Sequence, residues 1–293
     1  MSILGKSGQM GCLALVALIW IPWSHGAVLE EIVVTAQKRN QSMQDVGIAV
    51  TAFTGDQLKQ LGWASAEKVT AMTPGVTTIQ PNGPSSFFTN IRGVAQNDFS
   101  GDHQESPVAI YVDEVYISAA SGAGFQLFDF ERVEILRGPQ GTLFGRNATG
   151  GLVHYITRKP AQENEGYMEA TFADYNQTKI EGAFGGGLSD NLAGRLSFVR
   201  NKHDGVLKNR IGSDLNDGDD WAVRGQLLLT TDSNTTWLIS VRAAEQDVIV
   251  GPFTHRSARL NPVTGLGEDF NGPDLTDDGD SRIAQGFQDT DRD

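Results

Sequence analysis

The 293-residue chain contains a single cysteine, Cys12, close to its amino terminus. A disulfide needs two thiols and a thiolate zinc site needs several, so the sequence excludes a disulfide framework and a cysteine-based metal cluster. Basic residues are also few, because 23 Lys and Arg stand against 36 Asp and Glu, for a formal net charge of −13. Proteins that bind nucleic acid carry a basic face, so we expect no nucleic-acid partner.

Long apolar runs are scarce as well, and no segment after residue 27 reaches the roughly 18 apolar residues of a membrane-spanning helix. The apolar run near the start covers residues 12–21, with Lys6 before it and the small residues Ser24 and Gly26 after it. A basic start, an apolar core of about ten residues and a small-residue exit are typical of a secretory signal peptide. We therefore assign residues 1–26 to a cleaved signal peptide and expect the protein to be exported.

Glycine is abundant, with 34 residues, and several glycines fall in one connection between two apolar runs, residues 133–136 and 152–157. Both runs are rich in branched residues and predict strands. The glycines between them predict positive-φ turns and closely packed backbone. A phosphate-binding loop does not fit, because Gly145 is followed by Arg146 and Asn147 rather than by Lys and Ser or Thr. On this pattern alone, an ordinary glycine-rich hairpin stays possible.

A close resemblance to the plug domain of TonB-dependent outer-membrane receptors is carried by residues 131–151, ERVEILRGPQGTLFGRNATGG. Residues 90–93 and 108–113 resemble two further plug motifs, in the expected order. Glu114 and residues 152–155 depart from the family pattern without breaking a turn. The resemblance implies a plug domain over residues 42–160. Within it, residues 55–58 predict the start of a short helix, with Asp56 as its candidate N-cap. The resemblance also implies that certain residues hold the plug together and against a barrel wall: Arg92, Gly93, Arg137, Gly138, Gly141, Arg146, Gly150 and Gly151.

Residues 27–41 form a segment between the signal peptide and the plug. Its β-branched residues near a chain end favour an extended, mobile conformation, and a first edge strand of the next domain is the alternative. An extended peptide can join a partner's sheet edge through main-chain hydrogen bonds. The following residues resemble the TonB box, which the inner-membrane energy transducer TonB grips in this family: Glu31, Ile32, Val33, Val34, Thr35 and Ala36. We therefore expect TonB to bind residues 31–36.

After Pro160 the sequence alternates with period two over five segments of about ten residues, the length of a tilted strand that crosses a bilayer. In one segment Ile180, Phe184 and Leu188 share a face, and Lys179 and Glu181 lie on the other. A soluble β-sandwich would alternate too, but the plug resemblance favours a membrane barrel. The predicted fold is an α+β plug domain followed by the first ~5 antiparallel strands of an incomplete transmembrane β-barrel, over residues 161–293.

The number of strands raises a question of completeness. Receptors of this class have about 22 strands around a plugged lumen, whereas the residues after Pro160 leave room for about five. An open sheet with unpaired edges is unfavourable in lipid, where every backbone polar group needs a partner. We therefore expect an N-terminal portion of a receptor, which does not transport by itself.

Two polar plug loops, residues 80–88 and 97–106, are the candidates for ligand contact, because apical plug loops help to form the ligand site in the family. The candidate residues are Asn82, Phe87, Asp98, His103 and Glu105. The histidine and carboxylates of the second loop could bind a metal, but a solvated loop is the favoured interpretation. We predict neither a metal site nor a cofactor.

The resemblance implies a TonB-dependent receptor in the outer membrane of a Gram-negative cell, in contact with membrane lipid. Such a receptor takes up a scarce small-molecule ligand, here expected to be a ferric siderophore or another iron complex, with a cobalamin or an oligosaccharide as the alternatives. The sequence shows no Ser-His-Asp or metal-hydrolase pattern, so we do not expect an enzyme. Two alternatives stay open: a secreted, soluble β-rich binding protein or glycan-processing enzyme, and a nonfunctional remnant of the receptor family.

Overall fold

The computed structural model describes residues 32–35, 38–63, 65–80, 87–96, 105–118, 126–207, 213–231 and 235–249, and four short strands beyond them. The chain divides into two compact units, Met1–Glu31 and Ile32–Asp293, and every described residue belongs to the second. The predicted signal peptide, residues 1–26, therefore lies outside the described residues. So do five predicted site residues: Glu31, Ala36, Asn82, Asp98 and His103.

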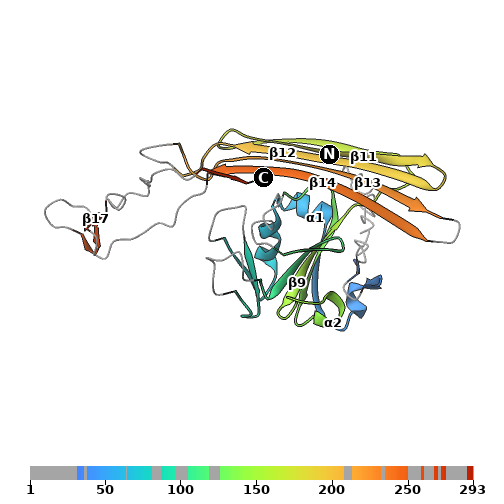
Figure 1. The fold of residues 1–293 in the computed structure, drawn as a ribbon, viewed down its shortest axis with the longest axis horizontal. Helices are drawn as coiled ribbons and strands as arrows, with labels where there is room; N and C mark the ends of the chain where they lie inside the picture. Colours follow the sequence, from blue (N-terminus) through green and yellow to red (C-terminus); the bar gives the residue numbers. More distant parts are fainter. Residues whose placement is uncertain are drawn as a thin grey trace, which may run out of the picture. The chain divides into compact units, whose positions relative to one another are not determined.

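The plug is built on a five-stranded mixed sheet in the order β3-β8-β9-β6-β7 (Figure 1). Its strands are β3 (Ala49–Thr54), β6 (Val108–Val112), β7 (Val115–Ile117), β8 (Phe130–Arg137) and β9 (Gly151–Thr157). Only β6 and β9 pair in parallel, and the other neighbours are antiparallel. Smaller elements surround the sheet: β1 (Val33–Val34), β2 (Gln41–Ser42), η1 (Met43–Asp45), α1 (Gly55–Gln60), η2 (Ala66–Met72), β4 (Val76–Ile79), β5 (Phe88–Ile91) and α2 (Gly141–Phe144).

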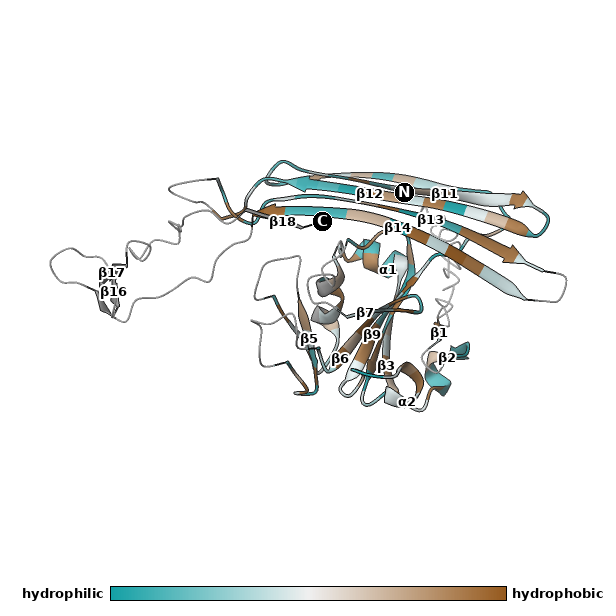
Figure 2. Cartoon of the chain, viewed as in Figure 1, coloured by the Kyte–Doolittle hydropathy of each residue, from teal (hydrophilic) through white to brown (hydrophobic). Residues whose placement is uncertain are grey.

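The central strands β8 and β9 are covered on both faces. Alternate residues of a strand point to opposite faces, and here Ile135 and Tyr155 join one apolar cluster whereas Leu136 and Leu152 join another. Figure 2 shows the resulting hydrophobic band along β9 and its neighbours. Burying each large apolar side chain contributes roughly 1.5–3 kcal/mol, so these two strands stabilise the plug from both faces of the sheet.

Helix α1 begins differently from the sequence expectation, which placed its N-cap at Asp56. The cap is Thr54, whose hydroxyl accepts a hydrogen bond from the backbone N–H of Gln57, while the Gln57 side chain accepts one from the N–H of Thr54. This reciprocal capping box satisfies two of the backbone donors that a helix start leaves open. A Cβ atom on Gly55 would lie 2.2 Å from the carbonyl oxygen of Phe130, so glycine lets α1 start directly against β8.

The glycine-rich connection joins β8 to β9, which pair antiparallel from Phe130↔Thr157 to Arg137↔Gly151. Gly151 has φ +140°, and a Cβ atom there would lie 2.2 Å from the carbonyl oxygen of Leu136. Gly150 also packs closely, since a Cβ atom there would lie 2.9 Å from the Val94 side chain and 3.2 Å from that of Val108. The close backbone packing predicted from the glycines is therefore present where the two central strands meet.

Five long antiparallel strands follow the plug: β10 (Glu165–Ala173), β11 (Gln177–Ser189), β12 (Leu192–His203), β13 (Gly218–Thr230) and β14 (Thr236–Ile249). They pair in chain order, and β18 (Asp289–Arg292) adds a short sixth strand beside β14. The strands β15 (Arg259–Leu260), β16 (Gly267–Asp269) and β17 (Gly272–Asp274) form a separate small sheet. The predicted fold class, a plug followed by about five antiparallel strands, is confirmed.

Within the described residues, no helix is both long enough and apolar enough to pass through a membrane.

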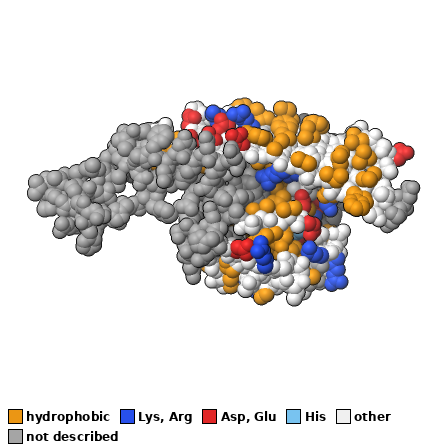
Figure 3. Space-filling view, in the orientation of Figure 1, with side chains coloured by type: hydrophobic (Ala, Val, Ile, Leu, Met, Phe, Trp, Pro, Cys, Tyr) orange, Lys and Arg blue, Asp and Glu red, His pale blue; other side chains and the backbone are white. Residues whose placement is uncertain are grey.

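The five long strands, hereafter the wall, have two unlike faces. One face exposes large apolar side chains (Figure 3): Met168, Phe172, Phe184, Leu188, Leu196, Leu227, Trp237, Ile239 and Val241. The opposite face carries buried polar side chains: Glu181, Arg195, Ser197, Asn201, Asp220, Arg224 and Gln226. Several of these bond to plug residues, so the polar face is the one that the plug covers, and the apolar face is the one suited to lipid.

Candidate functional site

The plug contacts the wall through a buried carboxylate, Asp129, directly before β8. Arg195 of β12 donates to both of its oxygens, with Nε at 2.7 Å from Oδ2, and the hydroxyl of Ser197 donates to Oδ2 at 2.5 Å. Arg224 of β13 donates to the Asp129 backbone oxygen at 2.9 Å and lies 3.3 Å from its carboxylate. Such charge-assisted bonds are strong, and removing one partner from a buried ion pair costs about 3–5 kcal/mol.

Apolar and aromatic contacts surround this ion cluster. Phe128 packs with Val199 and Ala222 of the wall. The guanidinium of Arg224 lies 4.8 Å from the ring centroid of Phe128 and 5.6 Å from that of Phe130, within the range of cation–π attraction. Because these neighbours exclude water, the charges of the cluster are screened less than surface charges.

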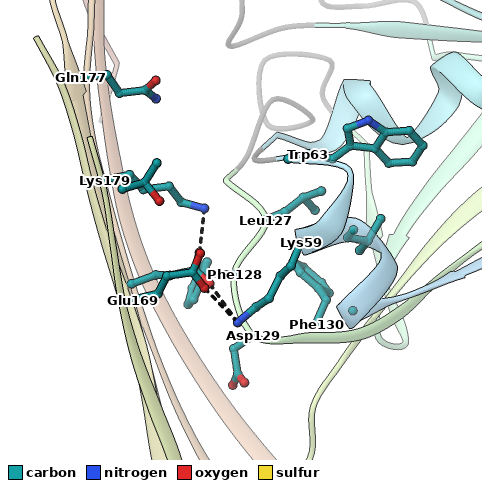
Figure 4. Close-up of a pocket in the computed structure, with 14 residues that line it drawn as sticks. Lys59, Trp63, Leu127, Phe128, Asp129, Phe130, Glu169, Gln177 and Lys179 are labelled. Atoms are coloured by element: carbon teal, nitrogen blue, oxygen red, sulfur yellow. Dashed lines mark hydrogen bonds and ion pairs between the residues drawn. The ribbon is translucent and has the colours of Figure 1, made fainter. Parts of the chain in front are cut away.

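A second contact, which is more exposed to solvent, lies beside a cavity of about 330 Å³ (Figure 4). Residues of α1 and the start of β8 line this cavity together with residues of β10 and β11. Lys59 of α1 lies 3.4 Å from a carboxylate oxygen of Glu169 and 3.6 Å from one of Glu181. Its ammonium also sits 3.7 Å from the ring centroid of Tyr167. Lys59 and Glu169 are exposed, and exposed pairs contribute roughly 0–1 kcal/mol, so the firm wall contact is that of Asp129.

The three arginines that the sequence assigned to the plug and its wall contact lie within the plug. Arg137 donates to the carbonyl oxygen of Pro74 at 3.1 Å and to the hydroxyl of Thr51 at 3.3 Å. Arg146 pairs with Glu105 at 3.1 Å. In the described part of the chain these contacts join plug elements to one another. The buried wall contact at Asp129 has the opposite polarity: the wall supplies the arginines and the plug supplies the carboxylate.

Arg92 and the predicted glycines occupy the turns of the plug. Arg92 has φ +52°, and its guanidinium lies 4.0 Å from where a Cβ atom of Gly138 would be. Gly93 and Gly138 have positive φ values of +79° and +117°, which favour glycine. Gly141 starts α2 with no atom close to its missing side chain, so its glycine is not required by space.

The described residues of the predicted TonB box, Ile32 to Thr35, are docked on the plug. Val33 and Val34 pair antiparallel with Ser42 and Gln41 as strand β1, and the Val34 side chain is fully buried in an apolar cluster with Leu136. The extended conformation was expected. In this conformation the segment pairs with β2 in a two-stranded sheet and buries Val34, as the alternative, a first edge strand of the following domain, would. The mobility of the segment stays an expectation.

Thr35 continues this contact with polar bonds to β8. Its backbone N–H donates to Oε1 of Glu134 at 2.7 Å, and its hydroxyl lies 3.2 Å from the same oxygen. Arg132 donates to Oε1 of Glu134 at 2.8 Å and to the Thr35 hydroxyl at 3.1 Å. Thr35 of the predicted box is thus hydrogen-bonded to Glu134 of β8, one of the two central strands of the plug.

Two predicted ligand contacts are described, and they differ. Phe87 is 1% exposed and belongs to the apolar core of the plug. The prediction that Phe87 contacts ligand is wrong for this conformation, because its side chain, at the end of a polar loop, packs in the core instead. Glu105 lies at the plug surface, where it pairs with Arg146 and accepts from Asn147.

A buried polar network that sequence reasoning missed joins β9 to the wall. Gln226 of β13 donates to the Thr157 hydroxyl at 3.0 Å, and the Asp113 carboxylate accepts from the Thr157 backbone N–H at 2.9 Å. Burial lowers the pKa of His154, so its ring is neutral near pH 7. Its Nε2 meets the carbonyl oxygen of Asp113 and must carry the proton, since a carbonyl only accepts. The signal available in the sequence was the alternation of β9, which points the polar side chains of residues 154 and 157 to opposite faces of the sheet.

No group of three or more His, Cys, Asp or Glu side chains among the described residues is placed to hold a metal ion.

These features together define a class of protein. A mixed α+β domain is fixed by buried charges to the polar face of antiparallel strands whose other face is apolar. That is the arrangement of a plug against the wall of a membrane β-barrel. Residues 42–152 match the family model of the TonB-dependent receptor plug domain. The chain therefore carries a plug domain of the TonB-dependent receptor family, followed by the wall strands.

Relatives of the chain are receptors and transporters rather than enzymes. The chain is 29% identical over 230 residues to the pesticin receptor of Yersinia pestis, a match that covers 75% of this chain and 33% of that receptor. It is 26% identical over 182 residues to the ferric-pyoverdine 358 receptor of Pseudomonas putida, covering 61% and 21%. It is 25% identical over 207 residues to the vitamin B12 transporter BtuB of Vibrio vulnificus, covering 68% and 32%.

Solved structures show the same fold. The ferric yersiniabactin uptake receptor FyuA of Yersinia pestis matches with a TM-score of 0.62 at 25% identity, over 69% of this chain and 32% of that one. The Pseudomonas aeruginosa receptor FpvA, bound to a pyoverdine–iron complex, matches with a TM-score of 0.65 at 19% identity, over 80% and 30%. The chain thus spans about a third of the length of the first curated relatives it matches.

Proposed function

We propose that the chain acts in energy-coupled uptake of a ferric siderophore, or a related iron complex, across the outer membrane. The observation that carries this proposal is a plug fixed to a polar wall face with a box-like segment docked on its central strand. The names of relatives support the cargo class, since those proteins include receptors for ferric yersiniabactin and ferric pyoverdine.

In the proposed mechanism, residues 1–26 direct export and residues 31–36 bind TonB. TonB adds a strand to the released segment, and several main-chain hydrogen bonds in series resist a pull along that strand. The pull then loosens the plug of residues 42–160 within a barrel that starts at residue 161. Asn82, Asp98, His103 and Glu105 stay the proposed ligand contacts, and Phe87 is withdrawn because it lies in the core.

Growth of an iron-limited strain tests the cargo and the coupling together. A strain deleted for the receptor gene and its own siderophore synthesis is complemented with a full-length receptor that contains this chain, either as the wild type or with Val33→Pro. Proline cannot donate a main-chain hydrogen bond, so we expect growth on ferric siderophore to fail with Val33→Pro while siderophore binding to whole cells persists. A conservative control, Val33→Ile, should restore growth.

The outcome also separates other cargoes. If growth responds to cobalamin and to no iron complex, the iron assignment is overturned, as the similarity to a vitamin B12 transporter allows. If Val33→Pro grows as well as the wild type, the assignment of residues 31–36 to TonB is overturned instead.

A further inference from the structure

The Glu134 side chain of β8 is fully buried, and one of its oxygens, Oε1, receives three donors. Two of the three come from Thr35, through its backbone N–H and its hydroxyl, and the third comes from Arg132. The other oxygen, Oε2, has no partner among the described residues. Most of the bonding of this buried carboxylate is therefore supplied by the box segment.

The same contacts occupy the groups that a partner strand would need. Segment 32–35 gives its edge to β2, where Val33 pairs with Ser42 and the carbonyl oxygen of Ile32 accepts from Met43 at 3.0 Å. The N–H of Thr35 is used by Glu134. Strand addition requires free main-chain donors and acceptors along one edge, so the docked segment offers a poor template for another protein.

We propose that Glu134 is the positioning residue that keeps segment 32–35 docked on β8. This inference rests on the proposed function, because it takes residues 31–36 to be the TonB-binding segment. Undocking removes two of the three hydrogen bonds from the Glu134 carboxylate, and losing hydrogen bonds to a charged group is costly. Arg132 keeps Glu134 paired when the segment leaves, so the docked state can re-form.

The other polar contact near the segment is weaker. Lys38 lies 3.1 Å from Glu114, but both side chains are largely exposed, and such pairs contribute little in water. Glu131 also contacts Arg132, from the exposed side, without touching Thr35. Glu131→Gln is therefore a matched control for Glu134→Gln: both remove one carboxylate charge beside Arg132, and only one of them acts on the segment.

The test uses the full chain with Cys12→Ser and Val33→Cys, which leaves one thiol at a residue that is 47% exposed. A nitroxide on this thiol reports the docked and undocked populations, and the periplasmic domain of TonB is titrated in parallel. With Glu134→Gln we expect the undocked fraction to rise roughly tenfold, the size expected for losing a hydrogen bond to a charged group. The apparent affinity for TonB should rise by the same factor, because only the competent fraction binds.

A second variant, Thr35→Val, keeps the inference testable if Glu134→Gln does not fold. Thr35→Val removes the hydroxyl contacts from the segment side and leaves the core of β8 intact, so it too should raise the undocked fraction. In the double variant the Thr35→Val effect should largely vanish, because the two changes break one contact. Glu131→Gln should leave the spectrum and the TonB affinity as in the parent.

Two results would overturn the inference. In the first, the label is as immobile in Thr35→Val and in folded Glu134→Gln as it is in the parent. In the second, the effects of the two substitutions on the undocked fraction simply add. If instead the label is released but TonB binds none of the variants, the docking contact stands and the proposed function fails.

Discussion

Individual buried ionisable residues of the plug join parts of the chain that are far apart in sequence. Asp129 meets Arg195, which lies 66 residues further along, and Glu134 meets Thr35 across 99 residues. A buried charge is tolerated when all its partners are present and costs several kcal/mol when one is removed. These residues therefore act less as sources of net stability than as contacts that specify which segments dock together.

His154 is the residue whose titration should be visible in plug stability. Burial lowers its pKa below the usual value of about 6.5, so the folded state binds the proton less readily than the unfolded state. The stability that the neutral ring contributes is complete above about pH 6.5 and is lost as the pH falls through the folded pKa. We expect His154→Asn to flatten the fall in unfolding temperature between pH 7 and pH 5, measured in detergent.

Comparison at pH 8 provides the control, since the two proteins then differ only through packing and the bond to the Asp113 carbonyl oxygen. An equally steep acid limb in the variant would show that other groups carry the pH dependence.

At the scale of elements, β8 is the strand on which the described contacts converge. The wall contact, Asp129, lies directly before its first residue, and the segment contact, Glu134, lies within it. Its neighbours are β3 and β9. In the proposed function, a pull on Thr35 therefore acts on the same strand that Asp129 ties to the wall.

The glycines of the connection after β8 should differ sharply in their tolerance of a side chain. Gly151→Ala forces a Cβ atom against the Leu136 carbonyl oxygen at a positive φ, so we expect a loss of about 3 kcal/mol or more in the free energy of unfolding. Gly141→Ala meets open space at the start of α2 and should cost nothing or stabilise slightly. Denaturant unfolding of the two variants measures the difference, and equal stabilities would contradict the packing described for β8 and β9.

At the scale of the whole molecule, the wall has one apolar face and one polar face, and the polar face meets the plug. We expect Val241→Arg, on the exposed apolar face of β14, to cost about 2–4 kcal/mol near the middle of a bilayer and to reduce insertion into lipid vesicles. Thr236→Arg, at the exposed end of the same strand, is the control and should insert nearly normally. Equal insertion of both variants would argue that this face does not meet lipid.

Much of this architecture was predictable from the sequence, because it depends on local patterns. Period-two alternation marked the wall strands, and the glycine-rich residues 138–151 marked the join of β8 and β9. Fine local features were less predictable: Thr54 rather than Asp56 caps α1, because the side chain of Gln57 completes a reciprocal bond. Phe87 was misread for a similar reason, since a polar loop sequence does not show which of its aromatic residues turns into the core.

The sequence by itself determined the plug domain, the order of plug and wall, and the position of a box-like segment, since each depends on residues close together in the chain. Only the tertiary structure decided that Arg195 and Arg224 of the wall hold Asp129, and that Glu134 holds Thr35. The physical reason is that a charged side chain pairs with whichever group the folded chain brings within reach. Periodicity and motifs carry no information on which carboxylate a distant arginine or backbone N–H will reach.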